Sequence, residues 1–81
     1  MPRKSAKTDP EEKLLKLGKA IRAARLECGL SQEALADASE IDRSHMGKIE
    51  RGERNVSFLN LARVAAALRM SVAALLVKAN I

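Results

Sequence analysis

The chain has 81 residues, of which 47 % are hydrophobic and 1 % aromatic, and its formal net charge is +5. This length allows one small domain, and a nearly purely aliphatic core favours packed helices over a β-sandwich. A single cysteine, Cys28, and a single histidine, His45, exclude an internal disulfide and a zinc site built from three or four such side chains.

Membrane and export signals are missing from the sequence. No apolar run approaches the roughly 20 residues that span a bilayer, and no charged segment followed by an apolar one opens the chain. Together with the lone cysteine, this leads us to expect a cytoplasmic protein. The excess of basic residues is compatible with a polyanionic partner, and no pattern indicates a metal, a cofactor or a small-molecule ligand.

The N-terminal tail and the first predicted helix have different sequence patterns. Residues 1–8 contain proline, small residues and three basic side chains without apolar periodicity, so we expect a flexible basic tail there and a single domain over residues 9–81. Asp9 as N-cap, Pro10 and Glu11 predict a helix that begins directly after Asp9. Its apolar residues recur at three- and four-residue spacing as far as Cys28, which we expect to be a small core residue, and Gly29 should end the helix.

Four further helix starts follow, each marked by a residue that caps a first turn: Ser31, Asp42, Ser57 and Ser71. Each helix behind them carries one apolar stripe. The predicted core residues in these stripes are Leu35, Ala38, Met46, Ile49, Phe58, Leu61, Val64, Ala65, Leu68, Val72, Leu75 and Leu76. The sequence therefore predicts an all-α domain of five helices.

The second and third predicted helices are joined by a short link, residues 39–41. So short a link favours a helix-turn-helix, in which the second helix of the pair crosses the first and projects from the body. Met46 and Ile49 would hold this helix to the core. Its outward face would carry Arg43, Ser44, Gly47 and Lys48.

These outward residues suit a major groove, which is about 12 Å wide and admits one α-helix. Arg43 offers two donors that match guanine O6 and N7, and Ser44 or His45 can bond a neighbouring base. Gly47 costs a helix about 1 kcal/mol relative to alanine, and a close approach of DNA or of a neighbouring helix would explain it. The alternative is a merely solvated face, with His45 packed over the turn or simply exposed.

The run LSQEALADASEIDRSHMGKIERGERN, residues 30–55, resembles the helix-turn-helix of the lambda-repressor and Cro-like family, the xenobiotic-response-element type. The likeness extends over about residues 14–76. It depends on residues that fall at the family's offsets: Gln32, Leu35, Ala36, Ile49, Glu50 and Gly52. The resemblance implies a compact five-helix fold that binds double-stranded DNA with its third helix.

The resemblance also implies roles for individual residues. The base-reading positions are Arg43, Ser44, His45 and Lys48. Gln32, at the start of the second helix, and Arg54, in the loop after the third, match positions that contact phosphates. Arg25 and Glu50 match an ion pair that ties the first helix to the third. His45 stands where restriction-modification controller proteins often have tyrosine or threonine.

Two turns depart from the family pattern. The family usually has glycine or asparagine where this chain has Glu40, and glycine commonly follows the fourth helix where this chain has Arg69. A left-handed backbone at either residue would cost about 1–2 kcal/mol. We therefore expect these turns to have a different shape and to tilt the recognition helix slightly.

A single module of this type contacts only a few base pairs, so the fold normally acts as a symmetric pair on a palindrome with half-sites about 34 Å apart. The last two predicted helices carry more apolar residues than one small core can bury. Candidate dimer-interface residues are Leu59, Ala73, Leu76, Val77 and Ile81. The alternative is that the alanines are present only as good helix formers.

These observations predict a transcriptional regulator that binds a palindromic operator as a homodimer and controls its own gene, as a repressor or a restriction-modification controller. RNA polymerase is a further candidate partner. An enzyme is not expected, because Ser44 and His45 are sequence neighbours and do not face each other on a helix. The competing hypothesis is the antitoxin of a toxin–antitoxin pair, which binds a protein toxin as well as DNA.

Overall fold

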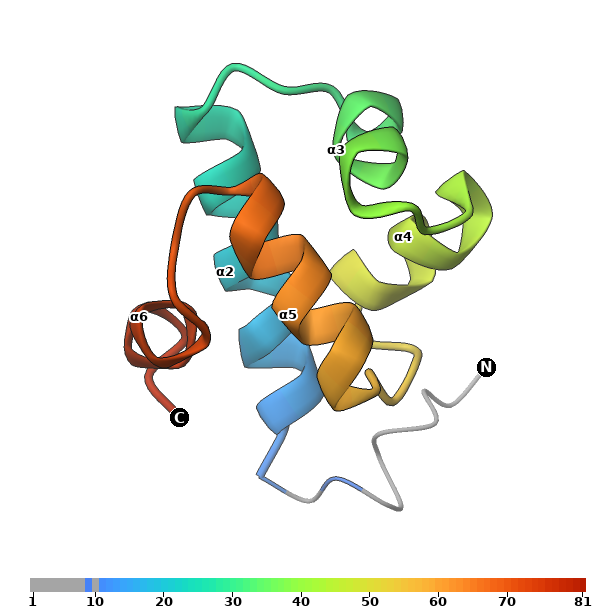
Figure 1. Cartoon of the computed structure of the whole chain (residues 1–81). Coiled ribbons are helices and arrows are strands. Elements are labelled where there is room, and N and C mark those ends of the chain that lie inside the picture. The colour runs from blue at the N-terminus through green and yellow to red at the C-terminus, as the bar shows by residue number, and fades with distance from the viewer. Residues whose placement is uncertain (1–8, 10) are drawn as a thin grey trace.

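Five helices make up the part of the chain that the computed structural model describes, residues 9 and 11–81 (Figure 1). They are α2 (Lys13–Glu27), α3 (Gln32–Ser39), α4 (Arg43–Glu50), α5 (Phe58–Ala67) and α6 (Val72–Lys78). The predicted all-α fold is confirmed. The tail predicted for residues 1–8 lies outside the described residues.

The longest helix, α2, is packed on opposite sides by α4 and α6 (Figure 1). The short helices α3 and α4 follow one another and pack together, and α5 packs against both α3 and α6. Each helix therefore buries one stripe against two or more neighbours. The helix pair α3–α4 lies at one flank of the domain, away from α6.

The four later helix starts have the predicted caps. In each, a side-chain oxygen accepts a backbone N–H of the first turn, which satisfies a donor that the helix itself leaves free. The pairs are Ser31 with Ala34 (3.0 Å), Asp42 with Ser44 (3.1 Å), Ser57 with Asn60 (3.2 Å) and Ser71 with Ala74 (2.9 Å).

The predicted start of the first helix is wrong by three residues, because α2 begins at Lys13. A turn precedes it, closed by a hydrogen bond from the Glu12 N–H to the Asp9 carbonyl (2.9 Å). The Asp9 carboxylate instead accepts the N–H of Leu14 (2.6 Å), inside the helix. Glu11, expected in the first helical turn, lies before the helix and pairs with Lys13 (3.0 Å).

Every described helix ends in the same way, with a left-handed residue and a hydrogen bond that spans six residues. The left-handed residues are Gly29, Glu40, Gly52, Arg69 and Asn80. The turn shape expected to differ at Glu40 and Arg69 is therefore wrong: both residues keep the left-handed backbone, with φ of 58° and 60°. After Glu40 the N–H of Ile41 bonds to the Ala36 carbonyl (2.9 Å). Burial of the Ile41 side chain offsets the backbone cost.

The core is aliphatic, as predicted, and its most fully buried members come from all five helices. Three predicted core residues are exposed instead: Cys28, Ala38 and Phe58. Each lies in, or just beyond, the terminal turn of a helix, where the apolar periodicity continues past the region that is covered by neighbours. Val72 and Leu76 are half-buried and pack against the edge of the core.

Within residues 9 and 11–81, no single helix is long and apolar enough to cross a membrane. By length and composition, α5 and α6 would meet that requirement only as a pair bent by 87°.

Candidate nucleic-acid interface

Helix α4 has two chemically distinct faces. Met46 is 0 % exposed and Ile49 is 1 % exposed, so these two side chains anchor the helix in the core. On the other face Arg43 and Ser44 are exposed, and Lys48 is half-buried. The polar side chains therefore stay outside while the helix itself is firmly held.

The first turn of α4 is organised by Asp42. Its carboxylate accepts both the backbone N–H and the hydroxyl of Ser44. The hydroxyl bond is the largest cause that lowers the pKa of Asp42 below 3.8, and the backbone bond follows. An ionised carboxylate can only accept, so the Ser44 hydroxyl must donate its proton to Asp42. The lone pairs of the Ser44 oxygen are then what it can offer to a ligand.

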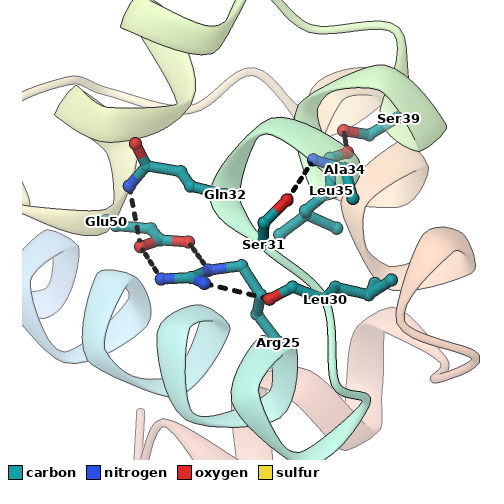
Figure 2. A network of polar contacts seen from close by, with 8 residues as sticks. All are labelled: Arg25, Leu30, Ser31, Gln32, Ala34, Leu35, Ser39 and Glu50. Atoms are coloured by element: carbon teal, nitrogen blue, oxygen red, sulfur yellow. Dashed lines mark hydrogen bonds and ion pairs between the residues drawn. The ribbon is translucent and has the colours of Figure 1, made fainter.

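A buried polar network joins the far end of α4 to α2 (Figure 2). The guanidinium of Arg25 donates to both carboxylate oxygens of Glu50, through Nε at 2.7 Å and Nη2 at 3.1 Å. Its Nη1 donates to the carbonyl of Leu30 (3.0 Å), in the turn before α3. The pair implied by the family resemblance is thus present, and it connects α2, the following turn and α4.

Gln32 belongs to the same network. Its side-chain Nε2 donates to Glu50 Oε1 (3.1 Å), which ties the start of α3 to the end of α4 (Figure 2). The sequence suggested a phosphate contact for Gln32 and did not indicate this bond. Gln32 Nε2 therefore bonds to another residue of the same chain. The first backbone N–H groups of α3 lie at the end of the helix that faces the surface.

The backbones of α2 and α4 come very close at Gly18, which is buried. A Cβ atom at this position would lie 2.6 Å from the carbonyl oxygen of Ile49. Only a residue without a side chain can occupy this contact. The end of α4 is therefore fixed directly against α2, independently of the ion pair.

A surface hollow of about 330 Å³ lies between the start of α3 and the outward face of α4. It is lined by Gln32, Arg43, Ser44, Gly47, Lys48 and Arg51. The structure therefore brings together four residues predicted for the site, but not His45, which is half-buried, or Arg54, which is exposed in the loop before α5. Arg51 was not predicted. The glycine inside α4, Gly47, was the sequence signal that could have indicated Arg51, because a missing side chain leaves room for a neighbouring one.

Among the described residues, no three histidine, cysteine or acidic side chains gather closely enough to hold a metal ion.

The fold, with a short α3 and a projecting α4, is that of a helix-turn-helix protein. A helix-turn-helix family model matches residues 21–75, and the chain belongs to this family. This confirms the resemblance that the sequence indicated.

The similar proteins are named as control or controller proteins and as a gene regulator. The chain is 42 % identical over 62 residues to control protein C.SmaI of Serratia marcescens, an alignment that covers 76 % of this chain and 74 % of that protein. The crystal structure of the restriction-modification controller protein C.AhdI from Aeromonas hydrophila has 47 % identity and a TM-score of 0.75, over 76 % of this chain and 94 % of that one. The clp gene regulator ClgR from Corynebacterium glutamicum has 37 % identity and a TM-score of 0.81, over 84 % and 72 %.

Proposed function

We propose that this chain is a transcriptional regulator that binds a palindromic operator in double-stranded DNA as a homodimer and controls its own gene, in the role of a restriction-modification controller. One observation carries the proposal: Arg43, Ser44 and Lys48 face outward from a helix whose opposite face is fully buried. The relatives named as control or controller proteins support the regulatory role.

We assign DNA contacts by chemistry. The bases are contacted by Arg43, Ser44, His45 and Lys48, and phosphates by Gln32 and Arg54. Arg43 presents a pair of donors suited to guanine. The Ser44 hydroxyl donates its hydrogen bond to Asp42, so its oxygen accepts a hydrogen bond from cytosine N4 or adenine N6. Glu50, the acidic residue of α4, is buried and paired with Arg25 at the far end of the helix.

The homodimer is proposed from apolar residues left uncovered on the last two helices. Leu59 is 67 % exposed, Val77 is 77 % exposed and Ile81 is 49 % exposed. Of the other two candidate interface residues, Ala73 is exposed and Leu76 is half-buried. Phe58, which was expected in the core, adds another exposed apolar side chain. A second copy would remove this surface from water, which is the main driving force for such association.

A toxin could cover the same residues, as the antitoxin hypothesis requires. We favour a second copy because the relatives carry the names of controllers and regulators. Sedimentation of the purified chain separates these cases: a homodimer alone supports the regulator, whereas a stable complex with a small co-purified protein supports the antitoxin.

The test of DNA recognition is selection of bound sequences from random duplex DNA, followed by binding measurements with Arg43→Ala. We expect a symmetric palindrome, and a loss of about 1–3 kcal/mol confined to one symmetric pair of positions. Lys19→Ala is the matched control, since it removes the same charge between α2 and α6. Uniform weakening across all sequences would show that Arg43 contacts a phosphate and not a base.

A further inference from the structure

The strongest feature not used by the proposed function is Arg51, the residue that follows α4. A Cβ atom on Gly47 would lie 3.2 Å from Arg51 Nη1 and 3.3 Å from Gln32 Oε1. Both side chains therefore border the same small space above Gly47. The absence of a side chain at Gly47 lets the Arg51 guanidinium lie across the outward face of α4, beside Gln32.

The charge of Arg51 is already paired. Its Nε lies 3.1 Å from Glu53 Oε2, and the two side chains are 58 % and 41 % exposed. Arg43 and Lys48 line the same hollow, but within the described part of the chain only Arg51 of the three has an ion pair. The hollow thus has two available cations and one that is held by a carboxylate.

The turn after α4 fixes the backbone of Glu53, the residue that carries this carboxylate. Gly52 has a left-handed backbone, and the Glu53 N–H donates to the Lys48 carbonyl (2.9 Å). The backbone of Glu53 is therefore held next to Arg51, while the long Arg51 side chain can exchange partners. An exposed ion pair of this kind is weak in water and is readily exchanged for a better acceptor.

We propose that Arg51 is a further phosphate contact for DNA, and that Glu53 holds its guanidinium in the free protein. This inference rests on the proposed function, since the ligand is the backbone of bound double-stranded DNA. A phosphodiester presents two charged oxygens to a guanidinium, as a carboxylate does, so it replaces Glu53 without a change in the type of bond. Glu53 thereby lowers the affinity for all DNA sequences and leaves the sequence preference to Arg43.

The test is a double-mutant cycle with Arg51→Ala and Glu53→Gln, measured on the duplex selected by the wild-type chain and on an unrelated duplex. Arg51→Ala should weaken binding to both by about tenfold, and the slope of log affinity against log salt should fall by about 1. Glu53→Gln should strengthen binding by about two- to fivefold. In the Arg51→Ala background, Glu53→Gln should have no effect.

Matched controls are Lys19→Ala, for loss of a positive charge, and Glu27→Gln, which removes an exposed ion pair with Lys78. Because Arg51 is exposed and Glu53 partly so, the variants should unfold at the wild-type temperature. The inference is overturned if Arg51→Ala behaves like Lys19→Ala. It is also overturned if Glu53→Gln still strengthens binding without Arg51, since Glu53 would then act by simple repulsion of DNA. If the wild-type chain binds no duplex, the proposed function fails, and this inference with it.

Discussion

Replacing Arg25 by methionine should destabilise the domain severely. The change removes both Arg25 donors to the Glu50 carboxylate and the bond to Leu30, and it leaves that carboxylate in place with Gln32 Nε2 as its remaining donor. The Glu50 side chain is only 3 % exposed, so water cannot take over from the guanidinium. Breaking a buried pair by removing one partner costs about 3–5 kcal/mol. Since a native domain is stable by only about 5–15 kcal/mol, most of the stability of this small domain would be lost.

Removing both charges should be much less harmful. In the double variant Arg25→Met with Glu50→Met, no charge is left buried, and only Gln32 and the Leu30 carbonyl lose a partner, at about 1 kcal/mol each. Urea unfolding, followed by circular dichroism at one fixed protein concentration, measures all three proteins. The reasoning is refuted if the single variant loses less than about 1 kcal/mol, or if the double variant is as unstable as the single one.

Two further changes test the helix ends. Glu40→Gly relieves the strain of a left-handed backbone (φ of 58°) and should stabilise the domain by up to about 1 kcal/mol in urea unfolding; no gain would mean that the backbone at Glu40 carries no strain. The hydroxyl of Ser44 holds the pKa of Asp42 below 3.8, so the stability from this charged cap is present above pH 3.8 and is lost as pH falls through the lowered pKa. Carbon-13 NMR titration should find that pKa below 3.8 and find it raised in Ser44→Ala; an unchanged midpoint would contradict the assignment.

Local chemistry made much of the fold predictable. A single serine or aspartate before each apolar stripe determined four helix starts, because the cap bond forms within one turn and needs no distant partner. The start of α2 could not be obtained in this way. The Asp9 carboxylate accepts the N–H of Leu14, five residues later in the chain. Several backbone conformations of the residues between them are compatible with the same sequence.

The parts that were missed depend on position in space. Phe58 has the periodicity of a core residue, but it is the first residue of α5 and extends beyond the neighbours that cover the rest of the helix. Gln32 and Glu50 are 18 residues apart, and their bond exists only because α3 and α4 are brought together. Arg51 was not predicted because its guanidinium reaches the hollow by lying beside Gly47, and apolar periodicity does not report where a long side chain bends.

The outward face of α4 and its buried face depend on different residues, and this has an evolutionary consequence. Arg43, Ser44 and Lys48 can be exchanged without opening a cavity, since the packing belongs to Met46, Ile49 and the contact at Gly18. Under the proposed function, a lineage of such proteins would acquire new target sequences by a few surface substitutions while its thermal stability drifts very little. Selection on target choice and selection on folding then act on nearly separate sets of positions.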